Sequence, residues 1–161
     1  MKLTDREKEL RLTSALEAIE EILNPDDVTD TLQKVCVILS ERIPYYNWVG
    51  FYLVDAENAG ELVLGPYVGA PTDHTRIPFG RGICGQAAER KATFVVQDVH
   101  QEDNYLACSL EVQSEIVVPI MKGDRVIGEL DIDSHELAPF SEVDRRFLEQ
   151  ICHRLADLWN T

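Results

Sequence analysis

The sequence has 161 residues, 45% of them hydrophobic and 27% charged, a balance typical of one folded domain rather than of a disordered chain. Fifteen basic against 29 acidic residues give a formal net charge of -14, which disfavours nucleic acid and anionic membranes as partners. No apolar run approaches the roughly 20 residues that span a bilayer, and the opening MKLTDRE lacks the apolar core of a signal peptide. We therefore expect a cytoplasmic protein with reduced thiols.

Two helices are predicted first. Apolar residues recur at helical spacing over residues 12–23. Residues 24–27 then offer a cap, a first-turn proline and first-turn acids for a second helix. The apolar stripe of this second helix runs to Ile43, and Pro44 marks its end.

The rest of the chain has mainly the pattern of strands. The predicted strands are 48–54, 61–67, 75–77, 93–96, 115–121 and 125–134. Pro119 indicates an edge position or a bulge in the fifth of them. A short helix is expected over 83–90, a long loop over 97–114, and a closing helix that Ser141 and Asp144 begin. This order predicts an α+β fold, a central, mostly antiparallel sheet flanked by N- and C-terminal helices, in a single domain spanning 1–161.

The four cysteines fall into two groups. Cys36 and Cys152 lie within helical apolar stripes and are expected to be core thiols. Cys84 lies at the start of the short helix, where the unpaired N–H groups of a helix N-terminus lower the pKa of a thiol. Cys108 lies in the long loop, after an apolar dipeptide. From these positions alone, Cys84 and Cys108 are either reactive thiols or small buried residues.

Carboxylates alternate with apolar residues in the segment ELDID at 129–133, so its three acidic side chains point to one face of a strand. Such a face is most often solvated. Hairpin pairing centred on Gly123 would place Glu115 opposite Asp131 on the same face. Like charges this close need a cation, which is either a metal, with His135 the one nearby histidine, or the ammonium group of a small ligand.

Trp48, Gly50 and Tyr52 share one face of the first strand, and Gly50 leaves room between the two rings. The pair either packs in the core or forms the wall of a small-ligand pocket. The four histidines form no local metal motif, so we expect neither a metal nor a cofactor.

Several ordered motifs resemble the free methionine-R-sulfoxide reductases. They are, in chain order, NWVGFY at 47–52, LGPY at 64–67, RIPFGRGICG at 76–85, VQDVH at 96–100, AC at 107–108, SEIVVP at 114–119 and LDIDS at 130–134. The resemblance implies a GAF fold, often dimeric, with a pocket that closes over free methionine sulfoxide.

The resemblance also implies roles for individual residues. Cys108 matches the cysteine that attacks the sulfoxide sulfur, and Cys84 matches one that can close a disulfide with it. The residues that match the carboxylates and the aromatic wall of the pocket are Glu115, Asp131, Asp133, Trp48 and Tyr52. One position departs from the family: His74 stands where many members carry a third cysteine, ten residues before Cys84.

The implied reaction needs no bound cofactor. Cys108 becomes a sulfenic acid, Cys84 condenses with it, and thioredoxin or a similar dithiol reduces the disulfide. Asp133 or Glu115, kept protonated by acidic neighbours, would supply the proton that the leaving oxygen needs. The competing hypotheses are a non-catalytic GAF module that binds a small molecule and a thiol redox sensor, because one fold hosts different functions.

Overall fold

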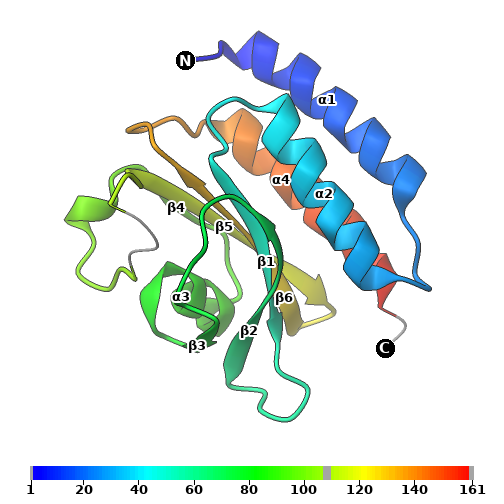
Figure 1. Ribbon diagram of the computed structural model, residues 1–161, viewed down its shortest axis with the longest axis vertical. Helices are drawn as coiled ribbons and strands as arrows, with labels where there is room; N and C mark the ends of the chain where they lie inside the picture. Colours follow the sequence, from blue (N-terminus) through cyan, green and yellow to red (C-terminus); the bar gives the residue numbers. More distant parts are fainter. Residues whose placement is uncertain (1, 107–109, 160–161) are drawn as a thin grey trace.

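The computed structural model describes residues 2–106 and 110–159. Its elements in chain order are α1 (Asp5–Ile22), α2 (Val28–Arg42), β1 (Trp48–Val54), β2 (Glu61–Val68), β3 (Arg76–Pro78), α3 (Gly82–Arg90), β4 (Phe94–Val96), the 3₁₀ turn η1 (Val99–Gln101), β5 (Ser114–Lys122), β6 (Arg125–Ser134), α4 (Glu142–Leu155) and the 3₁₀ turn η2 (Ala156–Leu158). The strands form one antiparallel sheet in the order β3-β2-β1-β6-β5-β4. The predicted α+β class and antiparallel sheet are confirmed (Figure 1).

Helices cover the two faces of the sheet unequally. α2 and α4 pack against one face, and α1 lies outside them as a further layer, whereas the short α3 lies on the opposite side (Figure 1). On the side of α2 and α4, the strands contribute an apolar set that includes Ile116, Leu130 and Ile132, all fully buried. This side is a packed core, stabilised by the burial of apolar surface.

The helix ends follow local sequence signals. Ser141 and Asp144 form the predicted capping box of α4. α2 ends at Arg42, ahead of Pro44, as expected. Its N-cap is Asp27, whose side chain accepts a hydrogen bond from the Asp30 backbone N–H. Pro25 therefore lies in the turn before the helix, and its prediction as a first-turn residue is wrong.

The hairpin of β5 and β6 differs from the predicted register by two residues. Its turn has two residues, since Lys122 pairs with Arg125, and a bulge follows between Ile120 and Met121. Each feature shifts the pairing by one residue, so Glu115 lies opposite Asp133 and not opposite Asp131. A shift of two preserves the side of the sheet to which each side chain points.

β5 has an outer edge that is only partly paired. β4 pairs with it at three positions, which end at Val117. Pro119 lies beyond them, where no N–H is needed for β4, so the predicted edge position is confirmed. No described helix is long and apolar enough to cross a membrane.

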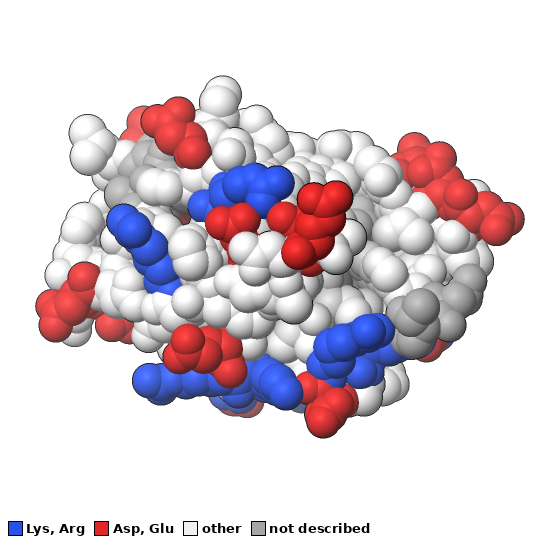
Figure 2. Space-filling model, turned by 90° about the horizontal axis from the view of Figure 1, so that it is seen from below, with Lys and Arg blue, Asp and Glu red and all other residues white. Residues whose placement is uncertain are grey.

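The acidic face of β6 is not solvated. Glu129, Asp131 and Asp133 are at most 1% exposed, and Glu115 is 4% exposed. Figure 2 shows acidic and basic side chains interspersed over the face seen from below, with no broad patch of one sign there. These four carboxyls are inside the molecule, beneath α3, and not part of its charged surface.

Candidate active site

Three cross-strand rows form the floor of the candidate site. Trp48 lies opposite Asp133, which pairs on its other side with Glu115. Gly50 lies opposite Asp131, and Tyr52 lies opposite Glu129. Because side chains alternate along a strand, all of these point to the side of α3. The aromatic face and the acidic face that the sequence indicates are therefore one surface.

The aromatic residues need Gly50. A Cβ at this position would lie 2.4 Å from the Trp48 ring and 2.8 Å from Tyr67 Cβ. The Trp48 ring stacks on Tyr67 at a centroid distance of 5.4 Å and on Tyr52 at 6.5 Å. The Tyr52 hydroxyl donates a hydrogen bond of 2.7 Å to the His74 carbonyl, which fixes the ring beside the acids.

α3 brings Cys84 onto the acidic floor. Cys84 is a buried free thiol, and its Sγ lies 3.8 Å from Oε2 of Glu115. Burial raises its pKa well above the ordinary value, and the negative charges of Asp131, Glu129 and Glu115 raise it further. The prediction that the helix N-terminus lowers the pKa of Cys84 is therefore wrong. Burial and the three acids outweigh the partial positive charge at the start of α3.

The pKa values of Glu129 and Asp131 are raised for the same reason. Burial raises the pKa of both carboxyls, strongly for Glu129, where the charge of Asp131 adds to the effect. Within the described chain, three of their carboxyl oxygens have no hydrogen-bond partner, namely both oxygens of Glu129 and Oδ1 of Asp131. A buried acid without partners is costly and therefore favours a ligand that would satisfy it.

The long loop reaches back over the start of α3. Asn104 accepts a hydrogen bond of 2.8 Å from the Gly82 N–H and donates one of 2.8 Å to the Gly80 carbonyl. It supplies the cap that Arg81 does not. Leu106 lies directly over Gly82, where a Cβ would approach Leu106 Cγ to 2.9 Å. This end of the loop is therefore the roof of the site.

Between roof and floor lies a pocket of about 10 Å³, close to the volume of one water molecule. It is lined by Tyr52, His74, Ile77, Gly82, Ile83, Cys84, Leu106, Glu115 and Asp131. Trp48 and Asp133 line a neighbouring pocket of about 70 Å³ instead, together with Asn47, Ala70, Glu111, Val112 and His135. The predicted site residues on the sheet thus lie side by side, but they are divided between these two small pockets.

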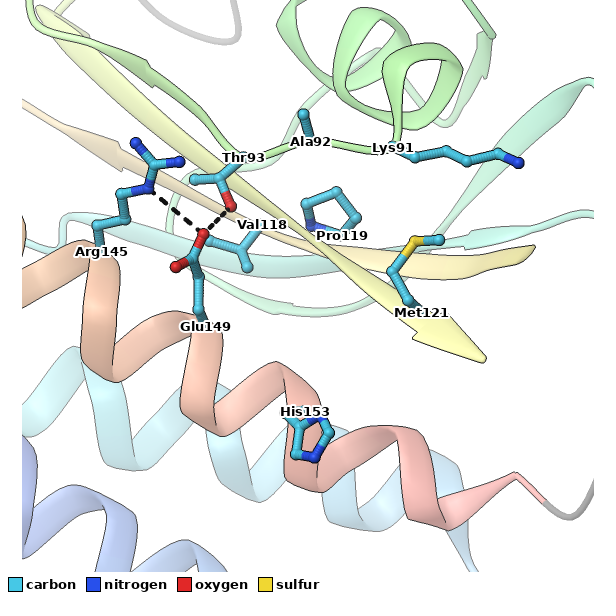
Figure 3. Close-up of a pocket in the computed structure, with 9 residues that line it drawn as sticks. All are labelled: Lys91, Ala92, Thr93, Val118, Pro119, Met121, Arg145, Glu149 and His153. Atoms are coloured by element: carbon cyan, nitrogen blue, oxygen red, sulfur yellow. Dashed lines mark hydrogen bonds and ion pairs between the residues drawn. The ribbon is translucent and has the colours of Figure 1, made fainter. Parts of the chain in front are cut away.

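A larger groove lies elsewhere. It has a volume of about 350 Å³ and lies between the segment that follows α3, the outer edge of β5, and α4 (Figure 3). Thr93 and Arg145 both contact Glu149 in it, at 2.6 and 3.4 Å. No cysteine among the described residues lines this groove. Its size alone does not make it the reactive site, because the thiol and the buried acids are elsewhere.

The remaining cysteines divide as follows. Cys36 and Cys152 are buried among the apolar side chains under the helices, as predicted. Burial raises the pKa of Cys36 to about 12. The predicted nucleophile, Cys108, lies outside the described residues.

Sequence reasoning missed three contributors to this site. Tyr67 stacks on Trp48, Asn104 caps α3, and the His74 carbonyl holds Tyr52. The sequence could have indicated Tyr67, because it is an aromatic residue on the strand that follows Trp48 and Tyr52. It could also have indicated His74, because this position differs from the family pattern. Asn104 carries no local signal, because the partners of its side chain lie more than 20 residues away.

Comparison with known proteins defines the family. A model described as "GAF domain" matches residues 25–160. The chain belongs to the GAF domain family. It is 41% identical to GAF domain-containing protein A of Dictyostelium discoideum over 94% of each chain. It is also 40% identical to the free methionine-R-sulfoxide reductase of Escherichia coli, over 78% of this chain and 73% of the relative.

A solved structure extends this similarity to the fold. Free methionine-R-sulfoxide reductase from Neisseria meningitidis, in complex with its substrate, superposes with a TM-score of 0.84 at 38% identity. The match covers 98% of this chain and 92% of the other. The resemblance that the sequence motifs indicated is confirmed, together with the GAF fold.

Proposed function

We propose that this GAF-domain protein reduces free L-methionine-R-sulfoxide to methionine by thiol chemistry. The observation that carries the proposal is the meeting of Cys84 with buried carboxyls and an aromatic wall under the loop that leads to Cys108. Leu106, which stands two positions before Cys108 in the sequence, lines the pocket.

The carboxyls suit a free amino acid. Glu115, Asp131 and Asp133 lie on adjacent strands and have little contact with solvent. An ammonium group would neutralise this cluster and donate charge-assisted hydrogen bonds to its carboxylate oxygens. A methionine sulfoxide within a peptide has an uncharged amide at that position and is expected to bind poorly. The rings of Trp48 and Tyr52 would contact the apolar part of the substrate.

The reaction proceeds in two chemical steps. The Cys108 thiolate attacks the sulfinyl sulfur, the sulfoxide oxygen takes a proton, and methionine leaves while Cys108 becomes a sulfenic acid. Cys84 then condenses with that sulfenic acid, which forms the disulfide and releases water. An external dithiol such as thioredoxin reduces the disulfide. Asp133 or Glu115, kept protonated by its acidic neighbours, is the carboxyl that we expect to supply the first proton, while Asp131 holds the substrate ammonium.

The pocket must open for this chemistry. Its volume of about 10 Å³ is far below the roughly 300–1,000 Å³ of ordinary ligand sites. The contacts of Asn104 and Leu106 over α3 are the ones that would have to yield. We take this structure as the closed form of the pocket. We also propose that residues 1–161 form one GAF domain, that the protein is a dimer and that it is cytoplasmic.

The test is conversion of free methionine-R-sulfoxide with thioredoxin or dithiothreitol, run beside the S epimer. We expect R-selective turnover that Cys108→Ser abolishes. Cys84→Ser is expected to release about one methionine per chain and then stall with thioredoxin, because no disulfide can form. Cys36→Ala and Cys152→Ala are matched controls, since these thiols lie under the helices.

Two results would contradict the proposal. Substantial turnover in Cys108→Ser would remove the assigned nucleophile. A folded protein with free thiols that fails to turn over with dithiothreitol would favour a ligand-binding module, or a redox sensor if peroxide alone forms the Cys84–Cys108 disulfide.

A further inference from the structure

Cys84, Glu115 and Asp131 form a compact set of metal-ligand atoms. The thiol sulfur and one carboxyl oxygen from each acid lie within 4.8 Å of one another, and all three residues are buried. They come from α3, β5 and β6, so three separate elements hold them in place. The Cys84 sulfur is 3.8 Å from the Glu115 oxygen, close to the separation of about 3.3–3.8 Å between ligands of a tetrahedral zinc ion.

A second observation points to a ligand here. Oδ1 of Asp131 is fully buried and has no hydrogen-bond partner within the described residues. Both oxygens of the neighbouring Glu129 are in the same condition. No ion pair in the described part of the chain joins either acid to a basic residue. The buried carboxyls of Asp131 and Glu129 therefore lack a positive partner within the described residues, which favours a cation as ligand.

The space and the donor types select the ligand. A pocket of about 10 Å³ has room for one ion or one water molecule. Calcium takes six to eight oxygen ligands, which this space does not provide. A thiolate beside two carboxylates suits a borderline-soft ion, and a bound metal displaces the thiol proton outright. A group of His74, which lines the same pocket, or a water molecule would complete four-fold coordination.

We propose that Cys84, Glu115 and Asp131 bind one thiophilic divalent cation, zinc, in the closed pocket. The ion occupies the carboxyls that would otherwise hold the substrate ammonium, and it ties up the thiol that resolves Cys108. Zinc is then a reversible inhibitor that competes with substrate. Binding does not depend on the reductase activity, whereas inhibition rests on the proposed function.

The experiment titrates the reduced, metal-free full chain with zinc chloride by calorimetry, with a chromophoric chelator as competitor. We expect one zinc per chain, and at least tenfold weaker binding in Cys84→Ala and in Asp131→Asn. Cys36→Ala and Cys152→Ala keep the binding, because those buried thiols lie away from the acids. Cobalt in place of zinc gives a sulfur-to-metal charge-transfer band that Cys84→Ala removes. Magnesium does not compete.

Absence of zinc binding, or unchanged binding in Cys84→Ala, overturns the proposal. If Cys84→Ala does not fold, Glu115→Gln and Asp131→Asn decide on the same readout. Stoichiometric binding in a protein that shows no turnover would retain the metal site and contradict the reductase. Turnover that zinc does not affect, in a protein that binds no zinc, would retain the reductase and contradict the metal site.

Discussion

Asp144 and Glu129 are both fully buried carboxyls, and they have opposite surroundings. Asp144 belongs to α4 and accepts hydrogen bonds from Lys8 Nζ of α1 at 2.8 Å and from the Tyr45 and Tyr46 hydroxyls at 2.7 Å each. Lys8 is itself only 4% exposed. Every charge in this cluster is paired, so it ties the N-terminal helix to the last one.

Glu129 has none of these partners. It lies on β6 beside Asp131, and neither of its oxygens is hydrogen-bonded to the described residues. Burial raises its pKa, so it holds a proton instead of a counterion. The comparison indicates that a buried acid with a full set of partners stabilises the fold. A buried acid without them lowers stability and remains available to a cation.

The largest effect is expected from Asp144→Ala. It leaves the Lys8 ammonium buried without its counterion, which costs about 3–5 kcal/mol. Urea unfolding monitored by circular dichroism measures this loss. Asp30→Ala is the control, because its pair with Lys34 is exposed and such pairs contribute about 0–1 kcal/mol. A loss below about 1 kcal/mol in Asp144→Ala would show that this cluster is not structural.

Asp131→Asn is expected to affect the ligand rather than the fold. A charge-assisted hydrogen bond contributes about 1.5–3 kcal/mol, so KM for free methionine-R-sulfoxide should rise by about 10–100-fold. The free energy of unfolding should stay the same or increase. Steady-state kinetics and urea unfolding measure the two quantities, with exposed Asp124→Asn as control. An unchanged KM would remove Asp131 from substrate binding.

Glu129→Met is expected to stabilise the protein by about 1–3 kcal/mol at pH 7, because it replaces an unsatisfied buried carboxyl with an apolar side chain of similar length. Glu129→Gln keeps the polar group and should give little of this gain. Thermal and urea unfolding of the two variants check the difference. Equal stability of Gln and Met would attribute the effect to charge alone.

The smallest expected effect is the pH dependence of the stability gained in Glu129→Met. The folded state raises the pKa of Glu129 well above its ordinary value, so at higher pH only the unfolded chain releases this proton. Stability therefore falls as pH rises above the ordinary pKa of a glutamate, until the raised pKa of the folded state is reached. The advantage of Glu129→Met should shrink between pH 7 and pH 4.5. An advantage independent of pH would indicate packing instead.

Local signals in the sequence predicted much of the fold. The Ser141–Asp144 capping box, the stop before Pro44 and the edge position of Pro119 each depend on neighbouring residues, and each is confirmed. Alternation over 129–133 predicted one shared face for its acids, because side chains alternate along any strand. The family motifs predicted the GAF fold.

Register, burial and proton affinity required the tertiary structure. The bulge near Met121 decided that Glu115 faces Asp133, and bulge position depends on packing along the whole hairpin. α3 and the loop at Asn104 decided that the acids are buried and that the pKa of Cys84 is raised. Sequence patterns alone supplied the candidate site residues and the side of the sheet to which those on strands point. Only the folded chain decided their distances and solvation, because both are set by residues far away in sequence.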